Sequence, residues 1–533
     1  MSAANSIRVS AAAEGPPSRW WVWLRVLVLA ALLASVAWAV AGTLHWPIVG
    51  DAPLLHYVCF LMDHGRLPYR DVFDMDMPGT YALEWAAIHL LGPGALAWRF
   101  ADFALVAVIG GAMVAIAAPV DWLAGAFAGA MFALIHFRDG PTHTGQRDLM
   151  MTAMLLPACA LLFWAVRRSH VTRSKGGASA LPLACGVLLG MATIIKPDGV
   201  LFALALAVML AVLLRGLQRP WAGPVLLVAA GYTLPLLVTA GWLWQHGALA
   251  AFVATCRGIV PYHASLGRPS LASLAVGSFP SVLMAITLPA IPVYVALRPW
   301  KSWEGAVLAI CTGLGAVHYI LQGKGFPYHR YPVEAFLLLL CALVLFPALR
   351  RGDWVRWPAL LGVLLGACFL APVSAQIACH YDWRNQEFNQ MLAADLTQLG
   401  GQRLQNKVQC IDNTAGCPNT LYNLQLVQAT GYLYSCYMLQ PQPARFQDAY
   451  RAGFWKALQA NPPQVIVVSD QDCFTMHRSF DILVRWPQLD GLLQSQYTLV
   501  AQRTPPHRVG WWRKPAVPFS YRIYVRKAGA GPV

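Results

Sequence analysis

The sequence predicts a polytopic α-helical membrane protein with about eleven transmembrane helices and a C-terminal extracytoplasmic α/β domain. Three observations lead to this fold class. Hydrophobic residues make up 57% of the 533 residues and charged residues only 12%, whereas a soluble protein carries about 25% charge. The apolar residues gather in blocks of near-spanning length. These blocks stop after Ala375, where the composition becomes that of a soluble domain.

Eleven apolar blocks approach the length that crosses a bilayer, about 20 residues. They cover approximately residues 26–46, 97–118, 122–137, 149–166, 181–195, 199–214, 222–244, 274–297, 304–321, 333–349 and 357–375. The first block resembles a signal sequence with a plausible cleavage site at Ala37-Trp38-Ala39. Its length favours a retained membrane anchor.

Basic residues test the span count independently. Clusters of Lys and Arg follow the even-numbered spans, at residues 167–175, 215–219, 298–301 and 350–356. Because cytoplasmic loops are enriched in Lys and Arg, we expect a multi-pass protein of the plasma membrane, here a bacterial inner membrane. Its parts are a cytoplasmic N-terminus (1–25), a transmembrane domain (26–375) with a large first extracytoplasmic loop (47–96), and an extracytoplasmic domain (376–533).

The net charge of +15 has the same origin. No basic stripe with stacking aromatics occurs in the sequence, so we exclude nucleic acid as a partner.

The C-terminal domain carries mixed secondary-structure patterns. We expect strands at Gln464–Asp470 and Tyr521–Arg526 and helices at 385–399 and 446–460. Its four cysteines are Cys410, Cys417, Cys436 and Cys473. Cys410 and Cys417 are candidates for a short disulfide loop, although the spacing leaves the pairing open.

Asp51 directly follows the first span, so the sequence places it at the outer membrane surface. Two roles are open for it. Asp is a common N-cap, and a helix begins at Ala52. An outward-facing carboxylate at a membrane surface can also act as a general base.

A second group of acids follows in the same loop, where Asp71, Asp74 and Asp76 fall within six positions. Such a cluster can bind a divalent cation or the hydroxyls of a sugar. The alternative is a solvated loop in which Asp71 pairs with Arg70 or Arg66.

Further polar residues reach the same face from other loops. Asp148 either caps the fourth span or adds an acid to a site. Lys196 and Asp198 flank a proline and can pair with each other. His329 and Arg330 lie beside aromatic residues, where they either anchor the chain at the interface or hold a lipid phosphate.

These residues carry a resemblance. Asp51 is followed by the pattern Gly65-x-Leu67-Pro68-Tyr69-Arg70-Asp71-x-Phe73-Asp74-x-x-x-Pro78 and then by an acid in the second outer loop. This order resembles the GT-C superfamily of polyprenyl-phosphate-sugar-dependent glycosyltransferases. The nearest branch looks like the bacterial relatives of protein mannosyltransferases, including the lipid-A glycosyltransferases. The similarity covers approximately residues 45–335.

The resemblance implies an inverting transfer of a sugar from a polyprenyl-phosphate donor to an extracytoplasmic glycan, lipid or protein. It makes Asp51 the base and Asp148 a second catalytic acid, with both as candidates for holding a divalent cation. Tyr69, Arg70, Asp71, Asp74, Lys196, His329 and Arg330 become substrate-binding candidates. Asp76 departs from the family pattern, which often has a cation there.

Two other classes of function remain open. A transporter or flippase of a lipid-linked glycan needs ionisable residues buried within the spans, and the sequence offers little beyond Asp102. A non-catalytic assembly subunit would tolerate the loss of Asp51.

Overall fold

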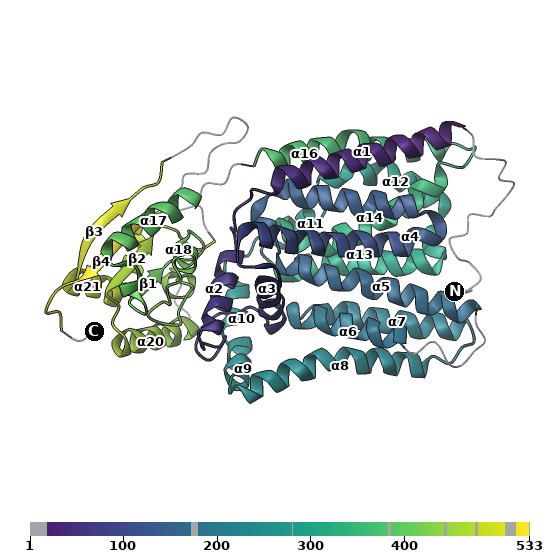
Figure 1. Ribbon diagram of the computed structural model, residues 1–533. Coiled ribbons are helices and arrows are strands. Elements are labelled where there is room, and N and C mark those ends of the chain that lie inside the picture. Colours follow the sequence, from purple (N-terminus) through teal and green to yellow (C-terminus); the bar gives the residue numbers. More distant parts are fainter. Residues whose placement is uncertain are drawn as a thin grey trace.

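The computed structural model describes residues 19–171, 180–279, 281–381, 385–441, 445–474, 478–506, 519–531 and 533. A bundle of long helices occupies one half of the molecule, and a small α/β domain lies beyond one end of it (Figure 1). Residues 1–18 of the expected cytoplasmic N-terminus lie outside the described residues, as do residues 172–175 of the first basic cluster.

The bundle accounts for the apolar blocks of the sequence. In the described part of the chain, nine helices are long and apolar enough to cross a membrane. The bundle helices are α1 (Arg19–Thr43), α4 (Ala95–Asp139), α5 (Arg147–Val171), α6 (Ala180–Ile195), α7 (Gly199–Gly216), α8 (Ala222–Gln245), α11 (Leu271–Gly277), α12 (Met284–Leu297), α13 (Trp303–Gln322), α14 (Tyr331–Ala348), α15 (Arg356–Leu364) and α16 (Ala371–Cys379). Short turns accompany them at η1 (Pro141–His143), η2 (Ser281–Leu283), η3 (Pro299–Lys301), η4 (Pro327–Arg330) and the π turn η5 (Leu365–Leu370).

The helix α4 is a hairpin of two crossings. Its helical geometry breaks at Asp121, next to Pro119, since proline cannot donate its backbone hydrogen bond. The two halves pack against each other through Gly110 and Gly129, whose missing side chains allow the backbones to approach. With α4 counted twice and the shorter α6 included, the eleven predicted crossings are all present.

The two ends of the bundle differ in charge. At one end, Asp121 accepts hydrogen bonds from Arg25 of α1 and from Arg350 after α14. Both cations belong to the face that the sequence assigns to the cytoplasm. The long first loop, the second loop and the C-terminal domain gather at the opposite end (Figure 1).

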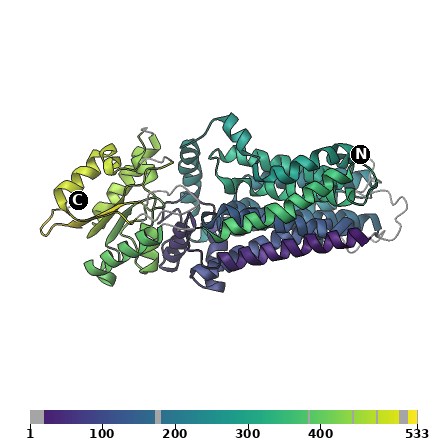
Figure 2. The ribbon, with the colours of Figure 1, turned by 90° about the horizontal axis from the view of Figure 1, so that it is seen from above.

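Four short helices lie between the bundle and the α/β domain. They are α2 (Ala52–Asp63), α3 (Pro78–Leu91), α9 (Leu249–Arg257) and α10 (Ile259–Ser265). The view in Figure 2 also places these elements between the two halves of the molecule. Two of the four helices, α2 and α3, belong to the loop 47–96, so much of this loop is helical.

The α/β domain is built on one four-stranded sheet of order β1-β2-β4-β3. β1 pairs with β2 in parallel, and β4 runs antiparallel to both of its neighbours. The elements of the domain are α17 (Asn385–Leu399), η6 (Gly401–Leu404), β1 (Val408–Ile411), α18 (Cys417–Asn423), α19 (Cys436–Leu439), α20 (Arg445–Ala460), β2 (Val465–Ser469), η7 (Phe480–Arg485), α21 (Pro487–Gln496), β3 (Tyr497–Arg503) and β4 (Tyr521–Arg526). Both predicted strands and both predicted helices are present.

The domain is fixed to the loops of the bundle by polar and aromatic contacts. The Tyr57 hydroxyl of α2 donates to the Leu426 carbonyl and accepts from the Gln428 amide, at 2.9 and 2.7 Å. Phe73 stacks on Tyr432 with ring centroids 4.2 Å apart. These contacts are fully or largely buried, so they position the domain directly over the loop end of the bundle.

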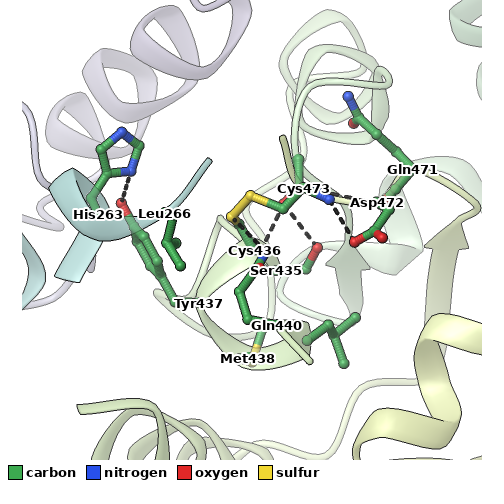
Figure 3. The surroundings of a disulfide bond; sticks show 12 residues. His263, Leu266, Ser435, Cys436, Tyr437, Met438, Gln440, Gln471, Asp472 and Cys473 are labelled. Carbon is green, nitrogen blue, oxygen red and sulfur yellow. Dashed lines mark hydrogen bonds between the residues drawn. A yellow bond between two sulfur atoms is a disulfide. The ribbon is translucent and has the colours of Figure 1, made fainter. Parts of the chain in front are cut away.

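Two disulfides stabilise the side of the domain that faces the bundle. One joins Cys410 to Cys417, and the other joins Cys436 to Cys473. Next to the second bridge, Tyr437 and His263 of α10 form a hydrogen bond of 3.2 Å (Figure 3).

The first helix, Arg19–Thr43, starts before the predicted apolar block 26–46 and includes Arg25. The structure corrects one expectation, because the spans are richer in ionisable residues than expected: Arg99, Asp102 and His136 are all buried in α4. In the sequence these residues look like isolated charges, whereas in the fold they contact one another as buried pairs.

Candidate active site

A buried arginine links the first two outer loops. The Arg147 guanidinium, at the start of α5, donates to Asp51 at 2.6 Å and also to Asp76. Asp51 occupies the N-cap position of α2, but its side chain makes no capping hydrogen bond. The side chain of Asp51 is 30% exposed, compared with 11% for Arg147 and 9% for Asp76. Asp51 is therefore the accessible end of this network.

A second network within the bundle positions Arg147. Asp102 accepts from the Gly145 amide at 2.7 Å, and Arg99 donates to the Thr144 hydroxyl at 3.0 Å. Arg99 and His136 also bind Asp102, at 2.8 and 3.0 Å. These buried charges are paired with one another, as burial requires. They fix the loop that directly precedes Arg147.

Gly145 allows this loop to lie close to α4. Its φ is +61°, a conformation that glycine adopts without strain. A Cβ at this position would lie 2.0 Å from the Trp98 ring. The loop therefore requires glycine here for two separate reasons.

A third network lies one residue further along α5. Asp148 is fully buried and contacts His318 at 2.7 Å and Lys196 at 3.3 Å. His318 also contacts Asp198, and the Lys196 ammonium donates to Gln322 at 2.8 Å. Burial raises the pKa of Asp198, but the His318 charge and hydrogen bond outweigh it and hold that pKa below its usual range.

The side chain of Asp148 contacts Lys196 and His318, which come from other parts of the chain. Lys196 and Asp198 each contact other partners, and no ion pair joins them in the described part of the chain. The two networks are neighbours because Arg147 and Asp148 are consecutive.

Within the 65–79 segment, Asp74 and Tyr69 serve mainly to fold the loop. Asp74 accepts from the Tyr81 hydroxyl and the Met75 amide, both at 2.7 Å. Burial, together with the nearby Asp76 carboxylate, raises the pKa of Asp74 to about 7. The Tyr69 hydroxyl donates to the Asp76 carbonyl at 2.6 Å. The Tyr69 side chain thus holds the backbone of Asp76, whereas Asp74 holds Tyr81 and the Met75 amide.

Four other candidates share no hydrogen bond with these networks in the described part of the chain, although His329 lies near enough to Asp148 to interact with it electrostatically. Arg70 pairs with Asp71 at 2.8 Å, and both side chains are about one-third or more exposed. Among the described residues, neither contacts Asp51 or Asp148 by hydrogen bond or ion pair. Arg330 pairs with Glu334 at 3.3 Å. His329 is buried, and its Nδ1 has no hydrogen-bond partner in the described part of the chain.

Asp51 and Asp148 do not form a ligand set for a divalent cation. Such ions take several oxygen ligands, yet the carboxylate of Asp51 is bound to Arg147, and that of Asp148 to Lys196 and His318. Among the described residues, no group of three or more His, Cys, Asp and Glu side chains is arranged to hold a metal. The two carboxylates are thus already engaged by other side chains and do not fit a divalent cation.

The sequence analysis did not select Arg147 or His318 as members of the site, and it considered Asp76 only as part of the acidic cluster at 71–76. Arg147 adjoins Asp148, so the adjacent opposite charges in one outer loop were an available signal. His318 lies inside the apolar block 304–321, and a buried histidine within a span was the signal there.

The similarity of this chain to known proteins lies in its fold. No family model matches the chain, and no curated protein matches it. It is similar to the crystal structure of ArnT from Cupriavidus metallidurans bound to undecaprenyl phosphate, with 12% identity and a TM-score of 0.55 over 96% of this chain and 99% of that one. The apo structure of the same ArnT gives 13% identity, a TM-score of 0.51 and the same coverage.

A second match is an archaeal protein. The oligosaccharyltransferase AglB from Archaeoglobus fulgidus, in complex with an inhibitory peptide and a dolichol-phosphate, gives 12% identity and a TM-score of 0.53. The match covers 92% of this chain and 80% of that one. The chain is thus a polytopic helical membrane protein with the GT-C fold that the sequence resemblance implied.

Proposed function

We propose that the protein is an integral-membrane inverting glycosyltransferase that transfers a sugar from a polyprenyl-phosphate donor to an extracytoplasmic glycan, lipid or protein. The observation that supports the proposal is the environment of the Asp51 carboxylate. Its carboxylate is partly exposed at the loop end of the bundle, caps no helix, and ion-pairs with Arg147. A base needs such access to an acceptor hydroxyl.

The reaction uses few protein groups. The acceptor oxygen attacks the anomeric carbon of the donor sugar while its proton passes to Asp51. The bond between that carbon and the phosphate oxygen breaks, and its electron pair leaves with the polyprenyl phosphate. Cations near the leaving group stabilise the developing charge. The networks described above supply two cations for this role, Arg147 and Lys196, and the Lys196 side chain is 12% exposed.

The same arginine would control the state of the base. Without donor, the Arg147 guanidinium donates a hydrogen bond to the Asp51 carboxylate at 2.6 Å and so occupies one of its oxygens. A donor phosphate attracts the same guanidinium, because Arg binds phosphate by charge-assisted hydrogen bonds. Donor binding would thereby release Asp51 for the acceptor.

Asp148 takes a positioning role in this proposal. It is fully buried and lies between His318 and Lys196. Its carboxylate holds the ammonium of Lys196 at the loop end of α6, where the cation is available to the donor phosphate.

The solved relatives support the donor class. ArnT was crystallised with undecaprenyl phosphate, and AglB was determined with a dolichol-phosphate. The membrane orientation rests on Arg25 and Arg350 at the opposite end of the bundle, which the positive-inside rule assigns to the cytoplasm of a bacterial inner membrane.

The test compares Asp51→Asn with Asp63→Asn in membranes at matched expression. Asp63 lies at the other end of the same helix and is 39% exposed, and it accepts from Trp85 Nε1 at 2.8 Å. Mass spectrometry follows the polyprenyl-phosphate-sugar pool and the surface glycans.

We expect Asp51→Asn to lower transfer about 100-fold or more, the usual effect of losing a general base. One lipid-linked sugar should accumulate, and one glycan should lose that sugar. The Asp63→Asn variant should resemble wild type. If both variants leave both pools unchanged, the transferase proposal is wrong, and the transport or assembly alternatives take its place.

A further inference from the structure

Arginines and tryptophans form a cluster where α1 begins, at the end of the bundle away from the α/β domain (Figure 1). Trp20 and Trp21 lie in the first turn of α1, with ring centroids 5.9 Å apart. The Arg350 guanidinium, after α14, lies 5.6 Å from the Trp21 ring. The Arg356 guanidinium, at the start of α15, lies 3.9 Å from the Trp20 ring. The proposed sugar transfer uses none of these residues.

Arg356 is a cation without an acidic partner. In the described part of the chain its side chain makes no hydrogen bond and no ion pair, and its Nε atom is buried. Its guanidinium contacts two rings instead, at 3.9 Å from Trp20 and 5.6 Å from Trp357. Buried polar groups nearly always have a hydrogen-bond partner. Because stacking on a ring occupies the face of a guanidinium, the N–H groups at the edge of Arg356 are available to an anion from outside the chain.

Asp121 balances only part of the positive charge in this cluster. Its carboxylate accepts from Arg25 at 2.8 Å and from Arg350 at 3.1 Å, and its side chain is only 3% exposed. Arg356 adds a third cation. These described side chains thus carry a net positive charge, which attracts a ligand of negative charge.

Exposed tryptophans around the cluster favour a lipid as this ligand over a soluble anion. Trp122, Trp354 and Trp357 are 48%, 59% and 65% exposed. Tryptophan side chains gather at the level of the lipid headgroups in a bilayer. Arg356 is also the first residue of an apolar helical segment that is long enough to cross a membrane. The phosphate of a bilayer lipid would lie at the same depth as its guanidinium.

We propose that the Arg356 guanidinium binds the phosphate of an anionic phospholipid where α15 meets α1. The planar guanidinium can donate two hydrogen bonds to one phosphate while its face stays on the Trp20 ring. Arg25 and Arg350 favour a headgroup of net negative charge over a zwitterionic one, since both add positive charge to the cluster. The bound lipid would tie the start of α15 to α1. The inference does not depend on the proposed sugar transfer.

The test measures lipid binding to the full chain in detergent micelles by native mass spectrometry. The probes are dioleoyl phosphatidylglycerol, which is anionic, and dioleoyl phosphatidylcholine, which has the same chains and no net charge. Inorganic phosphate is the competing soluble anion. Thermal unfolding in the same micelles shows which variants are folded.

Arg356→Gln removes the charge and the planar donor group. Arg356→Lys keeps the charge and guards against misfolding of the glutamine variant. Arg215→Gln is the matched control, because the exposed Arg215 guanidinium also lies over a tryptophan, 4.1 Å from the Trp221 ring, in a different basic loop. It tests whether the loss of any arginine on a tryptophan ring has the same effect.

We expect wild type and Arg215→Gln to bind phosphatidylglycerol equally, and more tightly than phosphatidylcholine. Arg356→Gln should bind phosphatidylglycerol about tenfold more weakly, the effect of losing a charge-assisted hydrogen bond. Arg356→Lys should lie between the two, because an ammonium does not match a phosphate with two parallel donors.

Three results would overturn the inference. Wild type binds both lipids alike, or the folded Arg356→Gln variant (Arg356→Lys where the glutamine variant does not fold) binds phosphatidylglycerol as wild type does, or Arg215→Gln loses as much affinity as Arg356→Gln. Displacement of the lipid by inorganic phosphate also contradicts it, because the ligand is then a soluble anion.

Discussion

The forked contact of Arg147 predicts unequal coupling energies for its two carboxylate partners. One nitrogen of the guanidinium contacts Asp51, whose side chain is 30% exposed, and the other contacts Asp76, whose side chain is 9% exposed. Solvent screens the first pair and largely spares the second. A double-mutant cycle for each pair measures this difference.

The magnitudes follow from burial. Removing one partner of a buried pair costs about 3–5 kcal/mol because the remaining charge stays uncompensated. Exposed pairs contribute about 0.2–1 kcal/mol. We therefore expect Arg147→Gln to destabilise the fold by about 3 kcal/mol. The Arg147–Asp76 coupling should be about 2–3 kcal/mol, and the Arg147–Asp51 coupling about 1 kcal/mol or less.

The assay is reversible unfolding in mixed micelles with Arg147→Gln, Asp51→Asn, Asp76→Asn and the two double variants. The exposed pair Arg351–Asp353, at 2.7 Å, provides a control cycle near the lower limit. Equal couplings for Asp51 and Asp76, or a larger one for Asp51, would refute the reasoning.

Three further predictions concern the supports of the site. Burial raises the pKa of Asp74 to about 7, so folding favours the protonated form of this carboxyl. The free energy of unfolding should therefore fall as the pH rises from about 4 to 7. Thermal unfolding of Asp74→Asn should lack this pH dependence. The Lys324 ammonium donates to the His263 and Leu266 carbonyls and lies 4.4 Å from the Phe474 ring. Lys324→Met removes these contacts and should loosen α10. Amide hydrogen exchange should become faster at 259–266 and stay unchanged in β2. Gly145→Ala should lower stability by about 2–4 kcal/mol through its positive φ and the Trp98 clash, whereas Gly111→Ala, with nothing within 4 Å of its added Cβ, should be neutral or slightly stabilising.

The membrane part was largely predictable because its signal is local. Each crossing is a run of apolar residues, and the bilayer sets its length. The hairpin in α4 was found as two blocks because Asp121 and Pro119 interrupt the apolar run. The first helix extends beyond the predicted apolar block 26–46, since Trp20 and Trp21 before Arg25 continue the helix outside the most apolar window.

The site was harder to predict because its members come from different loops. Asp51 and Asp148 were selected from position and resemblance, but Arg147 was not, because its charge next to Asp148 does not reveal that its partners, Asp51 and Asp76, lie in another loop. The sequence also weighed an N-cap role for Asp51, and the missing capping hydrogen bond and the contact with Arg147 are visible only in the folded structure. The substrate-binding roles predicted within 65–79 stay predictions, because side chains that support a loop and side chains that bind a ligand are of the same types.

The unequal burial of the two carboxylates also bears on how Arg147 could serve the donor. Separating Arg147 from Asp51 costs little, whereas separating it from Asp76 costs more, so Asp76 acts as a fixed anchor from which the guanidinium can turn toward a phosphate. This requires a fork that holds two acids at once. Arg147→Lys keeps the charge but presents a single ammonium, which cannot span both positions. We expect this variant to retain most of the stability that Arg147→Gln loses, yet to lower sugar transfer about tenfold or more. Wild-type transfer by Arg147→Lys at equal expression would mean that the charge alone is sufficient and that the fork has no part in donor binding.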